Sequence, residues 1–242
     1  MYKNAILITG AAQRIGLAAA RHFKKLGHLV IISYRTHRPM IQQLQADGIV
    51  CVKADFSTAQ GIRAFCTWIQ DNVSSLRALI HNASIWQSEH TYGFSDDLLT
   101  AMHQVHVAAP YQINYCCEAL LKAGADESET GFSDIIHITD YTVNRGSDKH
   151  IAYCASKAAL ANLSLSFSKR FAPKIKVNSI APSLILFNPQ DSQLYKDRTL
   201  KKSLLGNEPG EIEMVNAMAY VLNSRYMTGR ELNLDGGRHL MS

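Results

Sequence analysis

The chain has 242 residues, of which 47% are hydrophobic and 19% are charged, a balance typical of a globular protein with a sizeable core. No apolar run approaches the roughly 18 residues that a membrane span needs, and five cysteines without a Cys-x-x-Cys spacing favour reduced thiols over a disulfide framework or a zinc site. The formal net charge is +5, but residues 1–46 contain seven Lys or Arg and no acid, so the excess indicates a pocket for a small polyanion rather than a nucleic-acid surface.

Short apolar strand patterns alternate with helical patterns along the whole chain. The first strand begins close to the N-terminus without the layout of a signal peptide, so we expect a cytoplasmic protein with no membrane partner. The alternation predicts a single α/β domain over residues 1–242, with a Rossmann-like, doubly wound, parallel sheet of seven strands. Strands are expected at residues 5–9, 29–33, 49–52, 78–81, 135–139, 176–180 and 231–234. Helices are expected at residues 15–26, 39–46, 60–72, 96–122 with a break near Pro110, 151–171 and 211–222.

Two stretches interrupt this alternation. Residues 123–133 are polar and acidic, which predicts a surface loop between a helix and a strand. Residues 183–210 form a long and irregular connection, with Pro189 and Pro209 among scattered charges. A segment of that length in a compact domain is usually a lid or a binding loop, and plain disorder is the alternative.

The first predicted strand ends in a turn, Thr-Gly-Ala-Ala-Gln-Arg-Ile-Gly at residues 9–16, that leads directly into a helix. Glycine permits close approach of the backbone, and a helix N-terminus offers N–H groups and a positive dipole to a pyrophosphate. An arginine in the turn adds a planar guanidinium whose N–H groups can donate to a phosphate. The turn therefore predicts cofactor contacts at Gly10, Arg14, Ile15 and Gly16.

The end of the second strand indicates which dinucleotide binds. Proteins that bind NAD place an acid there to hold the ribose 2′-hydroxyl, whereas this chain reads Ser-Tyr-Arg-Thr-His at residues 33–37 and has no acid before Asp47. Arg35, with Tyr34 beside it and Arg14 in the first turn, is suited to a 2′-phosphate. The sequence therefore predicts NADP(H) as the cofactor, and the alternative is that Arg35 is a solvated loop residue.

Tyr153 and Lys157 lie four residues apart in a segment rich in helix formers, so their side chains should share one helix face. An ammonium close to a phenol favours the phenolate, which predicts that Lys157 lowers the pKa of Tyr153 towards the range useful for acid–base catalysis. The alternative is a Tyr and a Lys that share a helix face without a catalytic role.

These motifs together resemble the short-chain dehydrogenase/reductase family across essentially the whole chain. The resemblance rests on the first turn, the Tyr-x-x-x-Lys pair, an acid after the third strand, Asn-Ala after the fourth, the segment 178–182 and Asp-Gly-Gly at 235–237. It implies that Tyr153 and Lys157 are catalytic, that Lys157 also holds the nicotinamide ribose, and that Asp55 contacts adenine. The further cofactor contacts that it implies are Phe56, Asn82, Ala83 and Pro182.

Two departures from the common family pattern resemble pteridine reductases. Arg14 replaces the middle glycine of the first turn, and Asp140 replaces the usual catalytic serine thirteen residues before the tyrosine. This resemblance implies a Trp86 that stacks on a flat pterin, with a buried core role for Trp86 as the alternative. The substrate contacts that it implies are Ser84, Trp86, Arg14, Asp140 and Tyr153. Segments 33–37, 146–160, 176–188 and 235–240 resemble a bacterial subgroup that reduces dihydropterins and, less well, dihydrofolate.

His106 stands where the family usually has an asparagine of its fourth helix. We expect a proton-relay or hydrogen-bonding role in catalysis, with simple packing as the alternative. His103 and His106 form an i, i+3 pair, but no Asp, Glu or Cys at matching helical spacing completes a metal site, so no metal is expected.

The predicted reaction is hydride transfer from NADPH to C6 of a 7,8-dihydropterin, with proton delivery to N5 and a tetrahydropterin as product. Tyr153 and Asp140 are the predicted proton-handling groups, and family habit suggests a homotetramer. A 3-oxoacyl ketoreductase of the same family is one alternative, although it would favour Ser at position 140 and Asn at position 106. A non-catalytic NADPH-binding regulator is the other, and the intact Tyr153 and Lys157 argue against it.

Overall fold

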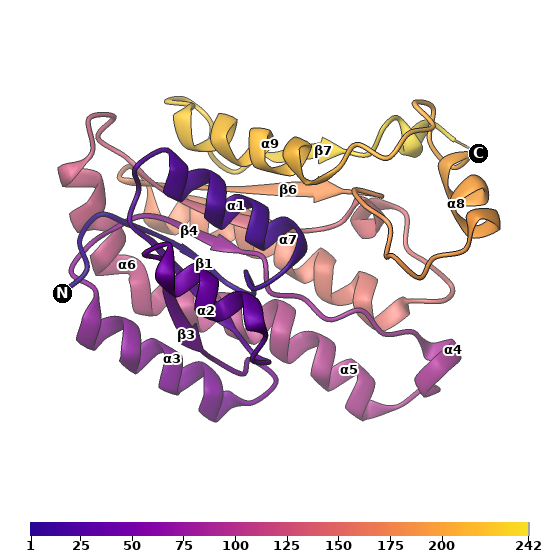
Figure 1. Ribbon diagram of the computed structural model, residues 1–242, viewed down its shortest axis with the longest axis horizontal. Coiled ribbons are helices and arrows are strands. Elements are labelled where there is room, and N and C mark those ends of the chain that lie inside the picture. The colour runs from indigo at the N-terminus through magenta and orange to yellow at the C-terminus, as the bar shows by residue number, and fades with distance from the viewer. Residues whose placement is uncertain (242) are drawn as a thin grey trace.

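The computed structural model describes residues 1–241, which form one parallel sheet of seven strands between two layers of helices (Figure 1). The strand order reverses in the middle of the sheet, and ligands usually bind beyond the carboxyl ends of the strands at such a reversal. The predicted α/β fold with a doubly wound seven-stranded sheet is confirmed. Across the sheet the strands are β3 (Val50–Lys53), β2 (Val30–Tyr34), β1 (Ala5–Ile8), β4 (Leu76–His81), β5 (Ser133–Ile138), β6 (Ile175–Pro182) and β7 (Glu231–Leu234).

Helices cover both faces of the sheet, so the strands are buried on both sides and read as nearly continuous apolar runs. One layer contains α1 (Arg14–Lys25), α2 (Pro39–Ala46) and α9 (Glu211–Asn223). The other contains α3 (Ala59–Asn72), α6 (Ala109–Glu127) and α7 (Ile151–Phe171). Alternate residues of β1 serve the two cores, since Ile6 and Ile8 pack in the first layer and Leu7 packs in the second.

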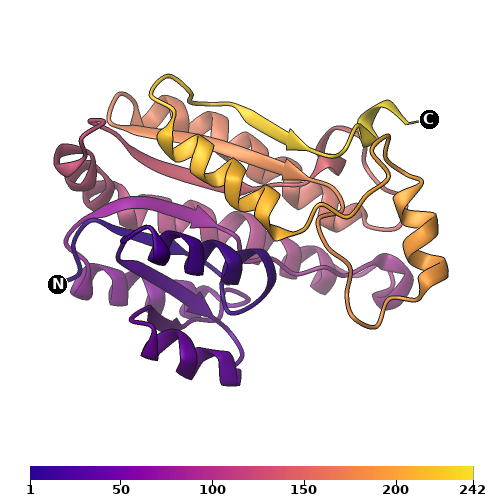
Figure 2. The ribbon, with the colours of Figure 1, turned by 45° about the horizontal axis from the view of Figure 1, so that its top comes forward.

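Segment 183–210 is more regular than the sequence indicated, because it contains α8 (Gln193–Leu200). The side chain of Ser192 begins this helix by accepting from the N–H of Tyr195 at 3.3 Å. The sequence gives no apolar stripe for α8, and among its residues Thr199 alone is buried. Figure 2 shows α8 beyond the carboxyl ends of β6 and β7, at the same end of the molecule as the short α4 (Glu89–Tyr92).

The predicted loop at 123–133 is wrong over its first half, because α6 continues to Glu127 and only residues 128–132 connect it to β5. Gly124 lies where α6 crosses β4, and a Cβ there would come within 1.9 Å of the carbonyl oxygen of Leu76. Two of the three acidic residues that suggested a loop are paired, Asp126 with Lys174 at 2.7 Å and Glu127 with Lys3 at 3.3 Å. The polar residues in the first half of this stretch therefore belong to the exposed C-terminal end of α6.

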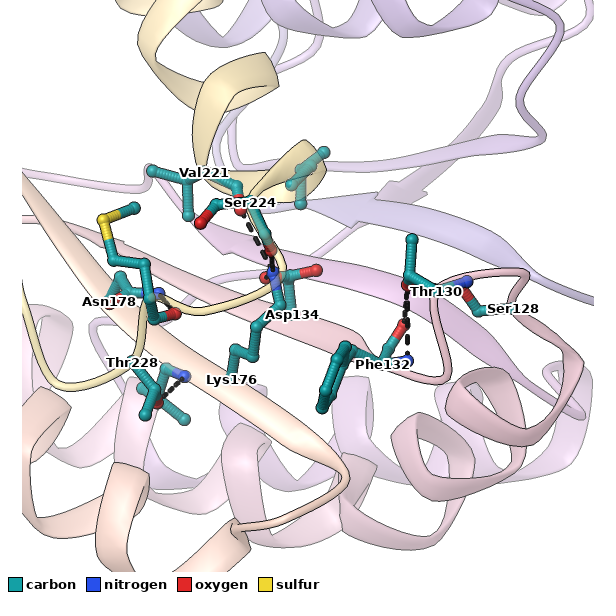
Figure 3. Close-up of polar contacts among 12 residues, drawn as sticks. Ser128, Thr130, Phe132, Asp134, Lys176, Asn178, Val221, Ser224 and Thr228 are labelled. Atoms are coloured by element: carbon teal, nitrogen blue, oxygen red, sulfur yellow. Dashed lines mark hydrogen bonds and ion pairs between the residues drawn. The ribbon is translucent and has the colours of Figure 1, made fainter.

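A buried ion cluster lies at the amino ends of β5 and β6, at the opposite edge of the sheet from the predicted site. Asp134 is fully buried and pairs with Arg77 at 2.6 Å and with Lys176 at 2.8 Å. Lys176 also donates to the carbonyl oxygens of Val221 and Ser224 at the end of α9 (Figure 3). Each charge in the cluster is thus compensated, and removal of one partner would leave a buried charge unpaired.

We expect Asp134→Ala to lower the free energy of unfolding by about 3 to 5 kcal/mol, because the buried cations Arg77 and Lys176 lose their counter-charge. Urea denaturation measures this free energy. The matched control is Asp126→Ala, which removes an exposed carboxylate from Lys174 and should cost less than about 1 kcal/mol. Similar losses for the two variants would show that the buried cluster does not stabilise the fold.

Candidate active site

A cleft of about 1440 Å³ opens beyond the carboxyl ends of the strands. The loops after β1, β2, β3, β4, β5 and β6 all line it, so residues far apart in the sequence meet there. Every residue predicted to contact cofactor or substrate lines this cleft, and so does every predicted catalytic residue except His106. The predicted residues that line it are Gly10, Arg14, Ile15, Gly16, Tyr34, Arg35, Asp55, Phe56, Asn82, Ala83, Ser84, Trp86, Asp140, Tyr153, Lys157 and Pro182.

The turn after β1 packs directly against the turn after β4. Gly10 has a φ of +64°, and a Cβ on it would lie 2.6 Å from Cα of Ala83. A Cβ on Gly16 would lie 2.5 Å from Nδ2 of Asn82, which donates to the carbonyl oxygens of Thr9 and Gly10 at 3.1 and 2.9 Å. The start of α1 has no side-chain cap and no acid in its first turn, so bare backbone lines the cleft there and forms a cradle suited to an anion.

Arg14 has an unusual backbone conformation at the first position of α1. Its φ of +52° lies in the left-handed region that favours glycine, and non-glycine residues held there cluster at functional sites. The guanidinium donates to Oδ1 of Asn188 at 2.5 Å and to the carbonyl oxygen of Leu186 at 3.1 Å. Arg14 therefore ties the first turn to the segment after β6, and its remaining N–H groups leave capacity for a phosphate.

Arg35 is exposed just after β2, and within residues 1–241 no carboxylate lies at ion-pair distance from it. Asp55 lines the same part of the cleft, but its Oδ1 accepts from the N–H and from Oγ of Ser57 at 2.9 and 2.7 Å. These two hydrogen bonds, with a smaller contribution from Arg35, lower the pKa of Asp55. The guanidinium of Arg35 is therefore available to a ligand.

Asp140 and Tyr153 form one hydrogen-bonded pair in the cleft. The Tyr153 hydroxyl donates to Oδ2 of Asp140 at 2.9 Å. The other carboxylate oxygen accepts from the N–H and from Oγ1 of Thr142, at 2.9 and 2.8 Å, in the 3-10 turn η2 (Tyr141–Asn144). Asp140 is thus fixed on one side by its own turn and is presented on the other side to the phenol.

The predicted lowering of the Tyr153 pKa is wrong. Burial and the adjacent Asp140 carboxylate raise the pKa of Tyr153 well above its usual value. The ammonium of Lys157 lies 5.7 Å from the tyrosine ring centroid and donates to the carbonyl oxygen of Ile138 at 2.7 Å. Burial lowers the pKa of Lys157 to about 8, and Asp140 opposes that shift. Tyr153 is therefore held in its protonated form, the form that a proton donor requires.

His106 is buried behind the cleft, in the π-helical turn η1 (Gln104–Ala108) that joins α5 (Asp96–His103) to α6. This turn is the break predicted near Pro110, and π-helical insertions often mark functional sites. Nε2 of His106 accepts from the N–H of Ile85 at 3.3 Å, so the ring proton lies on Nδ1 and is donated to Oγ of Ser156 at 2.8 Å. Burial, and then the charge of Lys157, lower the pKa of His106 to about 2, so the ring stays neutral.

The hydrogen bonds of His106 connect the loop after β4 to helix α7. Oγ of Ser84, which lines the cleft, donates to Nε2 at 2.9 Å, and Oγ of Ser156 donates to the carbonyl oxygen of Tyr153 at 2.7 Å. A neutral, buried imidazole with both nitrogens engaged favours the predicted hydrogen-bonding role over a proton relay.

Trp86 is 59% exposed, so the alternative of a buried core tryptophan is wrong. Its ring centroid lies 4.5 Å from that of Tyr153 and 4.2 Å from that of His150. Glu89 holds the same loop in place, because its carboxylate accepts from the N–H groups of Ile151 and Ala152 at the start of α7, at 3.1 and 2.8 Å. The indole therefore stands beside the Tyr153 ring with much of its surface open to the cleft.

Several lining residues were not predicted. Thr142 and His150 flank the Asp140–Tyr153 pair and Trp86, but a lone threonine or histidine in a loop gives no sequence signal. Five basic side chains also line the cleft, and they come from three separate segments in which the sequence showed only scattered charge. They are Arg145, Lys149, Lys201, Lys202 and Arg238.

Two further findings concern membranes and metal ions. Within the part of the chain that the structure describes, no helix is long and apolar enough to cross a membrane. Over the same residues, no group of three His, Cys, Asp or Glu side chains is placed to hold a metal ion. Nδ1 of His103, the partner in the i, i+3 pair, instead lies 3.1 Å from the carbonyl oxygen of Leu99.

Comparison with known proteins agrees with the fold. The family profile described as short chain dehydrogenase matches residues 4–198. The chain is 51% identical over 235 residues to a protein named dihydromonapterin reductase from Escherichia coli O6:K15:H31 (strain 536 / UPEC), covering 97% of this chain and 96% of that protein. The protein of the same name from Enterobacter sp. (strain 638) is 50% identical over the same shares.

Solved structures show the same fold. The FolM alternative dihydrofolate reductase 1 from Brucella canis, complexed with NADP, superimposes with a TM-score of 0.85 at 25% identity, covering 100% of this chain and 96% of that chain. The RhlG/NADP active-site complex from Pseudomonas aeruginosa superimposes with a TM-score of 0.86 at 23% identity, covering 99% and 97%.

Proposed function

The chain belongs to the short chain dehydrogenase family, and from that membership we propose that it is an NADPH-dependent oxidoreductase that reduces a 7,8-dihydropterin to the tetrahydropterin. The observation that carries the substrate class is the grouping of Trp86, Tyr153 and Asp140 around one open cleft. A flat indole face suits a flat heterocycle, and a phenol held by a carboxylate suits a ring nitrogen that must be protonated. Relatives at 51% identity that are named dihydromonapterin reductase support dihydromonapterin as the substrate. Dihydrofolate is the weaker substrate of the proposal.

The residues of the cleft fit NADP(H). The glycine turn at the start of α1 is a cradle that a Cβ at Gly10 or Gly16 would fill, which suits a pyrophosphate. Arg35 and Arg14 suit the 2′-phosphate, and Lys157 suits the nicotinamide ribose. The remaining proposed cofactor contacts are Ile15, Tyr34, Asp55, Phe56, Asn82, Ala83 and Pro182.

The proposed chemistry divides between cofactor and protein. NADPH supplies the hydride that reaches C6 of the pterin. Tyr153, protonated and held by Asp140, is the protein group placed to deliver a proton towards N5. Trp86 and Ser84 would position the ring, while His106 keeps the Ser84 loop fixed to α7.

The test of this function is NADPH oxidation with dihydromonapterin, dihydrobiopterin, dihydrofolate and a 3-oxoacyl thioester compared side by side. We expect the highest kcat/KM with dihydromonapterin. A faster reaction with the thioester would indicate a ketoreductase, and no turnover with any of the four would indicate a regulator that only binds NADPH. The homotetramer and the cytoplasmic location stay predictions that sedimentation and cell fractionation would test.

We expect NADPH to be preferred over NADH, and we expect Arg35→Asp to erode or reverse that preference. Loss of a charge-assisted phosphate contact should cost about 1.5 to 3 kcal/mol of NADPH binding, and the new carboxylate suits a ribose 2′-hydroxyl. The ratio of kcat/KM for the two cofactors measures the effect. Arg63→Asp is the matched control and should leave the ratio unchanged, because Arg63 is an exposed residue of α3 outside the cleft. Equal efficiency with both cofactors in the parent protein would contradict the assignment.

A further inference from the structure

The cleft carries much more positive than negative charge. Nine Lys or Arg side chains line it, against the three carboxylates of Asp55, Asp140 and Asp148. Three of the nine follow β1 and β2 and suit the cofactor, and Lys157 belongs to the catalytic pair. The other five follow β5, α8 and β7, and together we name them the basic rim: Arg145, Lys149, Lys201, Lys202 and Arg238.

The basic rim lies on the substrate side of the cleft, far from the predicted 2′-phosphate site. Five strand spacings separate β2 from β7, which is roughly 24 Å at about 4.8 Å per strand. Arg35 follows β2, whereas Arg238 follows β7, so one phosphate could not contact both. The rim instead begins beside the catalytic pair, because Tyr141 directly follows Asp140 and its ring lies 4.4 Å from the guanidinium of Arg238.

The rim is organised by contacts of its own. Arg145 donates to the carbonyl oxygens of Arg238 and Met241, at 2.9 and 3.1 Å, and so fixes the C-terminal turn η3 (Arg238–Leu240) against the cleft. Arg238 is half-buried and stacked on an aromatic ring, which orients its guanidinium. The rim therefore contains two arginines, Arg145 and Arg238, that are held in place by contacts of their own.

The rim charges are not compensated within the described residues. Lys202 has a lowered pKa because of burial and because Arg238, Lys149 and Arg198 lie near it. In residues 1–241 none of the five rim cations lies within ion-pair distance of a carboxylate, although the exposed Asp148 lines the same part of the cleft. Like charges that face one cleft repel one another and attract an anion to it.

We propose that the basic rim binds an anionic group on the side chain of the substrate, so that a dihydropterin binds more tightly when its C6 substituent carries a negative charge. The proposal rests on the proposed function. With the pterin ring against Trp86 and Tyr153, a substituent that passes Tyr141 reaches the rim. A phosphate ester and the glutamate carboxylates of a folate share this chemistry, whereas a neutral polyol side chain lacks it.

The test compares three substrates that share the dihydropterin ring: dihydromonapterin with its neutral side chain, the triphosphate ester of dihydromonapterin, and dihydrofolate. The variant is Lys149→Ala/Lys202→Ala, which removes two exposed rim charges. We expect the ratio of the KM for an anionic substrate to the KM for the neutral one to rise about tenfold in this variant. The same ratio should rise with added sodium chloride in the parent protein, because the contacts are solvent-accessible.

The matched control is Lys169→Ala/Arg170→Ala, which removes the same charge from the exposed end of α7 and should leave the ratio unchanged. A response of the triphosphate alone would identify phosphate as the bound group, and a response of dihydrofolate alone would identify carboxylate. A rise in the KM for NADPH with an unchanged ratio would overturn the proposal, because the rim would then serve the cofactor.

Calorimetric titration separates failure of this inference from failure of the proposed function. The three compounds are titrated into the protein with NADP+ bound, which needs no turnover. Tighter binding of the anionic compounds, lost in the rim variant, supports the rim site even if none of them is reduced. Equal Kd values for neutral and anionic compounds would overturn it, whether or not the pterins are reduced.

Discussion

Tyr153→Phe should lower kcat for dihydropterin reduction by about 10² to 10⁴ while the Kd for NADPH stays the same. The substitution removes one hydroxyl and keeps the ring that contacts Trp86 and His106, at centroid distances of 4.5 and 5.5 Å. It leaves Asp140 Oδ2 without its donor, but the carboxylate stays anchored through Thr142. Steady-state kinetics and a fluorescence titration of NADPH measure the two quantities separately.

Tyr141→Phe is the matched control for this prediction. Tyr141 lines the same cleft next to Asp140, but its ring faces Arg238 rather than Trp86. The loss of its hydroxyl should leave kcat within a few-fold of the parent value. If Tyr153→Phe also kept kcat within a few-fold, Tyr153 would be a packing residue and the proposed proton delivery would fail.

The fold could be predicted because its determinants are local in the sequence. Each strand is a short apolar run buried on both faces, so strand limits in the sequence match those of the sheet to within a few residues. The cleft residues could be predicted for the same reason, since Arg35 and Asn82 directly follow a strand and Asp140 lies two residues after one. Parallel strands place all such positions at one edge of the sheet.

The properties that could not be predicted depend on contacts between distant segments. The pKa of Tyr153 is set by Asp140 and by burial, whereas the i, i+4 spacing pointed to Lys157. The orientation of His106 depends on Ile85 and Ser156, which lie 21 and 50 residues away. The basic rim combines the loop after β5, the end of α8 and the C-terminal turn, none of which is distinctive alone.

Asp140→Ser and Trp86→Ala should separate chemistry from binding. Asp140→Ser removes the carboxylate that holds the Tyr153 hydroxyl, so kcat for a dihydropterin should fall at least about tenfold. Trp86→Ala removes the exposed indole face, so KM should rise by a factor equivalent to about 1 to 2 kcal/mol, with a smaller change in kcat. Unchanged pterin reduction in Asp140→Ser would contradict the proposed role of the carboxylate.

The pH dependence of Asp140→Ser gives a sharper result than its rate at one pH. Lys157 has a pKa of about 8, and the Asp140 carboxylate raises that value against the effect of burial. If the ammonium is required, kcat/KM for the parent should fall as pH rises through about 8. Without the carboxylate the pKa of Lys157 decreases, and the pKa of Tyr153 decreases as well, so the alkaline fall should begin at lower pH. If kcat/KM fell at the same alkaline pH in both proteins, Asp140 would not set the pKa values of Lys157 and Tyr153. A gain of activity towards a 3-oxoacyl thioester in Asp140→Ser, with no loss towards pterins, would instead favour carbonyl reduction as the native chemistry.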